Sequence, residues 1–150
     1  MLLKGSCHCR AVRFSLRSET PYPYMWCYCS ICRKTAGGGG YAINIMGRKE
    51  TLKVSGEKSL SAYKATRGGG SRYFCRKCGS ALWVWDKRWA EWVYPFASAI
   101  DTKLPVPKER QLIFLASKVN WSYLPEGKRF RAYPKEAIID WHRKRRLLAA

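Results

Sequence analysis

Apolar and polar residues alternate over several short stretches of this chain, a pattern typical of β-strands with one buried face. The alternating stretches are Ala11–Leu16, Thr51–Ser55 and Leu60–Lys64. Further strand candidates, richer in apolar residues, are Tyr41–Met46, Ala81–Trp85 and Leu112–Ala116. Glycine runs at residues 37–40 and 68–70 add turn signals between them. Strands and turns this closely spaced predict an all-β domain.

One helix is predicted near the end of the chain, over about residues 135–148. Pro134 precedes it, and Ile138 and Trp141 recur at helical spacing. The helix ends in the basic run Arg143–Arg146. Cations near a helix C-terminus are favourable in any protein, so this run fits an ordinary helix end as well as a nucleic-acid contact.

Length and composition favour one folded domain over residues 1–150. The chain is 47% hydrophobic and contains seven Trp and nine Tyr, whereas disorder requires few aromatics. The first residues hold no extended apolar segment, so no signal peptide is expected. The longest apolar runs are too short to span a bilayer. We therefore expect a cytoplasmic protein with no membrane partner; the oligomeric state stays open.

The formal net charge of +19 indicates that the protein surface attracts anions. Nucleic acid, acidic lipid and an anionic small molecule all fit this charge. A basic surface that serves solubility fits it equally well. The net charge therefore predicts that a partner is negatively charged, but it does not identify the partner.

Seven cysteines in three compact clusters are the strongest chemical signal. The clusters are Cys7-His8-Cys9, Cys27-Tyr28-Cys29-Ser30-Ile31-Cys32 and Cys75-Arg76-Lys77-Cys78. An odd number cannot pair completely, and cytoplasmic thiols stay reduced, so metal binding is favoured over disulfides. Structural zinc takes four protein ligands and reactive zinc takes three. Seven sulfurs therefore divide into a closed set of four and an open set of three.

The closed set is expected to join Cys7, Cys9, Cys75 and Cys78. Residues i and i+2 of an extended segment point to the same side, so Cys7 and Cys9 could clasp one ion from a single strand. Cys75 and Cys78 form a Cys-x-x-Cys turn in which Gly79 supplies a permissive backbone. A metal joining the start of the chain to its middle would be a folding element.

The open set consists of Cys27, Cys29 and Cys32, which can meet one face of a zinc ion. The only imidazoles that could close this site are His8 and His142. Both are expected at the surface, so water or a substrate thiol is the expected fourth ligand. Three thiolates make a soft site that favours sulfur as the exchanging ligand.

The residues near the open set favour thiol chemistry over hydrolysis. No Asp or Glu occurs between Glu19 and Glu50, so this segment offers no carboxylate base. Arg33 and Lys34 follow the three cysteines directly. We expect them to bind a substrate carboxylate, although a solvated basic pair is equally consistent.

These motifs resemble the glutathione-dependent formaldehyde-activating enzyme family, which also includes the vertebrate centromere protein V. The resemblance covers about residues 5–127. It rests on Gly5-Ser6-Cys7-His8-Cys9, Ala11-Val12-Arg13-Phe14, Cys27-Tyr28-Cys29-Ser30-Ile31-Cys32-Arg33-Lys34, Val54-Ser55-Gly56, Phe74-Cys75-Arg76-Lys77-Cys78-Gly79-Ser80, Ile113-Phe114 and Ser117-Lys118-Val119-Asn120-Trp121. This chain differs from the usual pattern at Ser6, Arg10, Tyr28 and Leu112.

The resemblance implies an Mss4-like fold, mainly β, with several coiled antiparallel sheets around zinc. It implies a structural zinc at Cys7, Cys9, Cys75 and Cys78, and a second zinc at Cys27, Cys29 and Cys32. It also implies an enzyme that joins formaldehyde to glutathione, giving S-hydroxymethylglutathione, and that is classed with carbon–sulfur lyases.

Three hypotheses follow from the sequence. The first is a zinc-dependent carbon–sulfur lyase that acts on a thiol adduct, with Cys27, Cys29 and Cys32 at the reactive site and glutathione as co-substrate. The second is a zinc-scaffolded module whose basic surface binds nucleic acid or another polyanion without catalysis, above all through Arg143–Arg146 and the basic cluster near Lys128, Arg129 and Arg131. The third is a redox switch in which the three cysteines bind no metal and form a reversible disulfide.

Overall fold

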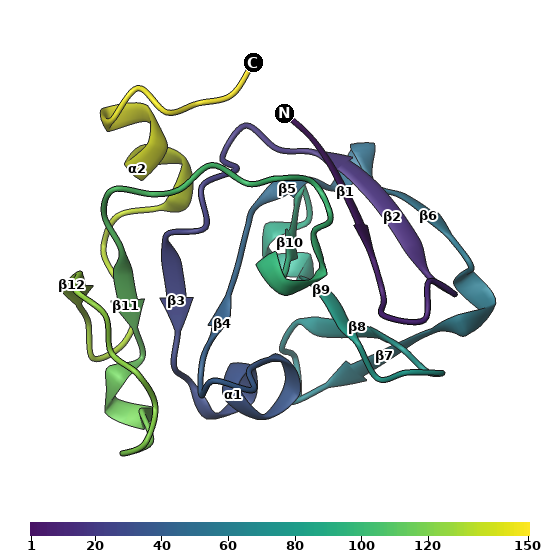
Figure 1. The fold of residues 1–150 in the computed structure, drawn as a ribbon, viewed down its shortest axis with the longest axis horizontal. Helices are drawn as coiled ribbons and strands as arrows, with labels where there is room; N and C mark the ends of the chain where they lie inside the picture. Colours follow the sequence, from purple (N-terminus) through teal and green to yellow (C-terminus); the bar gives the residue numbers. More distant parts are fainter.

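Three small β-sheets form the framework of the structure, a computed structural model that describes all 150 residues (Figure 1). The first sheet has the order β1-β2-β6, and its strands are antiparallel. They are β1 (Leu2–Ser6), β2 (Arg13–Arg17) and β6 (Lys53–Ser55). Leu3, Phe14 and Leu16 are buried while their sequence neighbours are more exposed, so one face of this sheet covers the core.

The second sheet has five antiparallel strands in the order β5-β10-β9-β8-β7. They are β5 (Gly47–Arg48), β7 (Leu60–Lys64), β8 (Ser71–Cys75), β9 (Ala81–Trp85) and β10 (Trp92–Pro95). Strand β8 is held on both sides, by β7 and β9, and it ends at Cys75. The sheet therefore fixes the backbone that leads into the Cys75–Cys78 turn.

The third sheet has the order β12-β11-β3-β4 and is mixed. Its strands are β3 (Met25–Cys27), β4 (Ala42–Ile43), β11 (Gln111–Ile113) and β12 (Lys128–Arg129). Strand β11 runs parallel to both β3 and β12, so these two pairs depart from the antiparallel pattern. Ile113 pairs with Cys27, which places the residues after β11 beside the second cysteine cluster.

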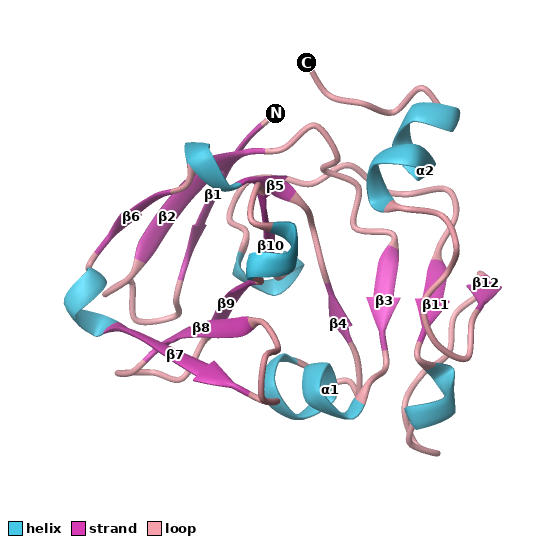
Figure 2. Ribbon diagram, turned by 180° about the vertical axis from the view of Figure 1, so that it is seen from behind, coloured by secondary structure: helices cyan, strands magenta, loops and turns pink.

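The structure also has two α-helices and five 3₁₀ turns, all of which lie between strands except α2, which follows the last strand (Figure 2). The α-helices are α1 (Ser30–Ala36) and α2 (Ile138–Lys144). The 3₁₀ turns are η1 (Lys49–Thr51), η2 (Glu57–Ser59), η3 (Lys87–Trp89), η4 (Ala97–Ala99) and η5 (Leu115–Ser117). No helix has the length and apolar character needed to cross a membrane.

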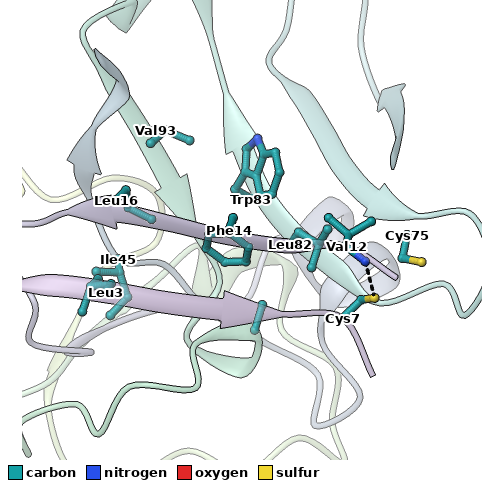
Figure 3. Close-up of a cluster of buried hydrophobic side chains, with 11 residues drawn as sticks. Leu3, Cys7, Val12, Phe14, Leu16, Ile45, Cys75, Leu82, Trp83 and Val93 are labelled. Atoms are coloured by element: carbon teal, nitrogen blue, oxygen red, sulfur yellow. Dashed lines mark hydrogen bonds between the residues drawn. The ribbon is translucent and has the colours of Figure 1, made fainter. Parts of the chain in front are cut away.

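The buried side chains form two core clusters, and each contains part of one cysteine group. The larger cluster comprises Leu3, Cys7, Val12, Phe14, Leu16, Ile45, Cys75, Leu82, Trp83, Val93 and Ala99 (Figure 3). The second comprises Tyr24, Met25, Cys27, Cys32, Ala42, Phe96, Ile113 and Trp141. Each group of sulfurs is thus supported by close-packed apolar side chains.

Each of the six predicted strands overlaps a strand of the structure, but the structure has twelve strands and most of the six differ in extent. The predictions at Leu60–Lys64 and Ala81–Trp85 match β7 and β9. Of Tyr41–Met46, only Ala42–Ile43 forms a strand, and the rest continues through isolated bridges. The stretch from Leu112 to Ala116 leaves the extended conformation after Ile113, because Phe114 has a left-handed φ of 58°. Strand β6 is shorter than predicted because η1 extends to Thr51.

The predicted C-terminal helix is real but spans only seven residues, Ile138–Lys144. It ends because Arg146 has a left-handed φ of 55° and the N–H of Leu147 turns back to the carbonyl of His142. Three residues of its basic run are paired within the chain. The pairs are Arg143–Asp140, Lys144–Glu136 and Arg145–Glu109.

Aromatic stacking anchors helix α2 to the core. The same contacts show that the prediction of a surface position for His142 is wrong. The ring of Trp141 lies 3.7 Å from that of Tyr24 and parallel to it. His142 is fully buried; its Nδ1 lies 2.8 Å from the Ile138 carbonyl, and its Nε2 accepts a hydrogen bond from the N–H of Tyr22. Burial lowers the pKa of this imidazole, so it serves as a neutral packing group.

Gly56, which follows β6, fits closely against the turn that carries Cys7 and Cys9. Its φ is +80°, and a Cβ atom there would lie 1.7 Å from the carbonyl oxygen of Ala11. Gly68 has a similar φ of +77°, but a Cβ atom there would meet nothing within 4 Å. An alanine at either position would therefore suffer backbone strain, but only at Gly56 would it also clash with another atom.

We expect Gly56→Ala to destabilise the protein by about 3 kcal/mol or more. Gly68→Ala is the matched control and should cost only about 1 kcal/mol, because it adds left-handed strain without a clash. Urea denaturation of both variants provides the measurement. Equal losses of stability would show that close packing at Ala11 is unimportant.

Candidate metal centres

The first cysteine group joins two turns that are far apart in the sequence. Cys7 and Cys9 lie in the turn between β1 and β2, and Cys75 and Cys78 lie at the start of the turn between β8 and β9. All four Sγ atoms lie within 4.8 Å of one another. The grouping is the one predicted, but Cys7 and Cys9 do not lie in one strand: the chain turns after β1, and the turn brings their sulfurs together.

The spacing of these four sulfurs suits a tetrahedral metal. The Sγ of Cys9 lies 3.6 Å from that of Cys7 and 3.8 Å from that of Cys75. Zinc–sulfur bonds of about 2.3 Å in a tetrahedron place sulfurs about 3.8 Å apart. The N–H of Val12 donates to Cys7 Sγ at 3.2 Å (Figure 3). A hydrogen bond with Ser80 lowers the pKa of Cys78 to about 5, which favours the thiolate that metals require.

The second group is built where β3 passes into α1. Cys27 is the last residue of β3, and Cys29 is the N-cap of α1, where its Sγ accepts a hydrogen bond from the N–H of Cys32 at 3.2 Å. The three Sγ atoms lie within 4.8 Å of one another. Cys27 and Cys32 are buried, while Cys29 is half-buried. One side of this group is therefore closer to solvent.

Proximity prevents the three thiols from ionising independently. Hydrogen bonds from Cys27 and Cys32 lower the pKa of Cys29 to about 2. Hydrogen bonds of Cys27 with Cys29 and Cys32 raise the pKa of the Cys27 thiol above its usual range. A divalent cation among the sulfurs would relieve this conflict, because it stabilises all three thiolates together. The donor set fits a soft or borderline metal such as zinc.

No histidine, carboxylate or further cysteine lies close enough to the second group to act as a fourth metal ligand. The group contains only the three cysteines, without histidine or carboxylate. His8 is exposed in the turn of the four-sulfur group, and His142 is buried against Tyr22 and Ile138. Three sulfurs without a fourth protein ligand match the pattern of zinc sites that keep one position for exchange.

Arg72 is a site residue that the sequence analysis missed. It lies on β8, and its Nη2 donates to Cys32 Sγ at 3.6 Å while its Nη1 donates to Thr35 Oγ1 at 3.3 Å. Forty residues separate Arg72 from Cys32. Only the pairing of β8 in the second sheet brings its guanidinium to α1, so no local sequence signal indicates this role.

Tyr133, which follows β12, is a second residue that was missed. Its ring meets that of Phe114 edge-on at 4.6 Å, and Phe114 directly follows the residue paired with Cys27. Although much of the residue is exposed, partial desolvation by its neighbours, and then the charge of the three nearby sulfurs, raises the pKa of Tyr133. The C-terminal segment therefore contributes an aromatic hydroxyl to the surroundings of this group.

A cleft of about 690 Å³ separates α1 from the four-sulfur group. The predicted residues Arg33 and Lys34 line one wall, and Arg10 lies in the opposite turn with Asp101 nearby. The Nε of Arg33 is buried and has no hydrogen-bond partner within the chain. The three sulfurs of the second group do not line this cleft, so Arg33 and Lys34 occupy a neighbouring space and do not contact those sulfurs from within it.

Comparisons with known proteins agree with the resemblance of the motifs. Residues 2–116 match a family described as glutathione-dependent formaldehyde-activating enzyme. A protein of Halomonas elongata is 54% identical to this chain over 149 residues, which cover 95% of each chain. That protein is provisionally named a glutathione-dependent formaldehyde-activating enzyme. A crystal structure of a Rhodobacter sphaeroides protein is similar, with a TM-score of 0.57 and 27% identity, over 68% of this chain and 91% of that one. Tyr133 and α2 lie outside the range of the family match.

We expect two zinc ions per chain, and one in each of the variants Cys9→Ser and Cys29→Ser. Only Cys9→Ser should lower Tm strongly, by roughly 10 °C or more, because it releases the link between two distant turns. Serine keeps the N-cap of α1 in Cys29→Ser, so that variant loses metal without losing the helix. Metal analysis by mass spectrometry and thermal melts provide the test. Equal melting of the two variants would contradict the division into a folding site and an exchange site.

Proposed function

Because this chain belongs to the glutathione-dependent formaldehyde-activating enzyme family, we propose that it joins formaldehyde to the thiol of glutathione at a zinc ion held by Cys27, Cys29 and Cys32. The observation that carries the proposal is the convergence of three sulfurs that have no fourth protein ligand. The product would be S-hydroxymethylglutathione, and the reverse reaction is that of a carbon–sulfur lyase. Reduced thiols persist in the cytoplasm, where we expect the protein to act.

The reaction needs a thiolate and a protonated product. The sulfur attacks the formaldehyde carbon, the C–S bond forms as the C=O π bond opens, and the oxygen takes up the proton that the thiol lost. A zinc ion bound at the three sulfurs would lower the pKa of the arriving thiol, so that a larger fraction of it would be thiolate. Strand β3 and the N-cap of α1 hold the sulfurs in place beforehand, which limits the reorganisation needed.

The cleft beside α1 suits the charged ends of glutathione. Glutathione carries two carboxylates and one ammonium group. The cleft offers three cations, Arg10, Arg33 and Lys34, together with the carboxylate of Asp101. Arginine binds carboxylates through paired N–H donors, and the Nε of Arg33 has no other partner. We therefore assign Arg33 and Lys34 to substrate carboxylates, with the thiol reaching past α1 toward Cys29 and Cys32.

The competing hypothesis of a nucleic-acid module rests on net charge alone. Two basic clusters favoured it. Lys128, Arg129 and Arg131 take part in none of the ion pairs of the structure and keep their charge free. The run Arg143–Arg146, in contrast, has three of its four side chains in ion pairs with Asp140, Glu136 and Glu109. Such pairing reduces the charge that this run presents to a phosphate backbone. The enzyme hypothesis accounts for the cysteine geometry as well, and we favour it for that reason.

We expect zinc-loaded protein to accelerate the exchange between glutathione, formaldehyde and their adduct at least tenfold over buffer, which NMR exchange spectroscopy measures. Cys29→Ser should abolish the acceleration while keeping the fold, because it removes one ligand and preserves the N-cap. Lys53→Gln is the control, because Lys53 is exposed and belongs to neither cysteine group. This variant should accelerate the exchange as much as the wild type does. Wild-type exchange no faster than buffer would remove the proposal.

Arg33→Gln and Lys34→Gln should each raise the KM for glutathione about tenfold and change kcat little. A charge-assisted hydrogen bond to a carboxylate is worth about 1.5–3 kcal/mol when it is lost, and this exposed cleft lies at the low end. The exposed Arg129→Gln on β12 is the control for net charge. An unchanged KM in both cleft variants would place the carboxylates elsewhere.

A further inference from the structure

Arg72 carries a positive charge that no carboxylate of the chain neutralises by an ion pair. The hydrogen bonds of its guanidinium go to Thr35 Oγ1 and Cys32 Sγ. Most arginines with a partner in this protein point to Glu or Asp, as Arg48, Arg88 and Arg145 do. The charge of Arg72 therefore acts on the three-sulfur group.

The guanidinium is held firmly in this position. Arg72 lies within β8, opposite Tyr63 on one side and Val84 on the other. Its second anchor, Thr35, is itself fixed, because its hydroxyl donates to the carbonyl of Ile31 at 2.7 Å. The side chain is half-buried, so water screens its charge less than it would at the open surface.

The charge of the loaded site explains why a fixed cation matters there. A divalent ion with three thiolates carries a net charge of −1, because two positive and three negative charges combine. A fourth thiolate would bring the site to −2, whereas a neutral ligand would leave it at −1. Without a nearby cation, the site would thus disfavour the anionic ligand that the proposed reaction requires.

We propose that Arg72 is a positioning residue that makes the metal at Cys27, Cys29 and Cys32 accept an anionic thiolate in preference to a neutral ligand. The inference rests on the proposed metal-dependent function and adds the origin of its ligand preference. Arg72 acts through Cys32, to which it donates, and does not itself ligate the metal. A merely structural role, in which Arg72 ties β8 to α1, would affect all ligands alike.

The test compares the binding of one anionic and one neutral ligand to cobalt-loaded protein. The probes are 2-mercaptoethanol, which binds as a thiolate and lacks carboxylates for the cleft, and imidazole. Each is titrated against wild type, Arg72→Gln and Arg72→Lys, following the visible absorption of cobalt and the new sulfur-to-cobalt charge-transfer band. Thr35→Val removes the second anchor without changing charge, and the exposed Lys64→Gln on β7 removes one charge away from the group.

We expect Arg72→Gln to weaken 2-mercaptoethanol binding about tenfold and imidazole binding about twofold or less. Arg72→Lys should retain most of the preference, because it keeps the charge even where the fork of hydrogen bonds is lost. Thr35→Val and Lys64→Gln should change the ratio of the two affinities by about twofold at most.

Equal weakening of both ligands in Arg72→Gln, or no weakening of either, would overturn this inference and leave the proposed function intact. A wild-type spectrum that responds to neither ligand, and equals that of Cys29→Ser, would overturn the proposed metal site and this inference with it. Because 2-mercaptoethanol does not depend on the cleft, failure of the carboxylate assignment would leave the result unchanged.

Discussion

The meeting of four sulfurs from two distant turns is the constraint on which the rest of the site depends. Cys7 and Cys9 come from the first hairpin, and Cys75 and Cys78 come from the turn after β8. Closing so long a loop costs chain entropy, and a metal bound by the four sulfurs would offset that cost. The closure also fixes the end of β8, and with it Arg72, and it forms one wall of the cleft opposite α1.

The second group of sulfurs is local, and this difference accounts for the different role that we propose for it. Its three cysteines lie within one strand end and the first turn of a short helix, so the backbone alone brings them together. Losing a metal there leaves the distant connections of the fold intact. A site whose metal is not needed for folding can keep one side for exchange, and the half-buried Cys29 marks that side.

The sequence supports the division of the cysteines because metal-ligand spacing is a local property of the chain. Strands β7 and β9 were also predictable, since their ends are marked by charged or turn-forming neighbours. Helix α1 was not expected, because seven residues are too few to establish a helical period. Arg72, Tyr133 and the burial of His142 depend on contacts between segments far apart in the sequence, which no local pattern encodes.

Zinc X-ray absorption with and without glutathione tests the central claim most directly, because it counts sulfurs around the metal. Groups of four and three predict about 3.5 sulfurs per zinc in the free protein, rising to about 4 when glutathione is added. An average of 4 before glutathione, or one that stays at 3.5 afterwards, would mean that the three-sulfur site does not accept the thiol, and the account would be wrong.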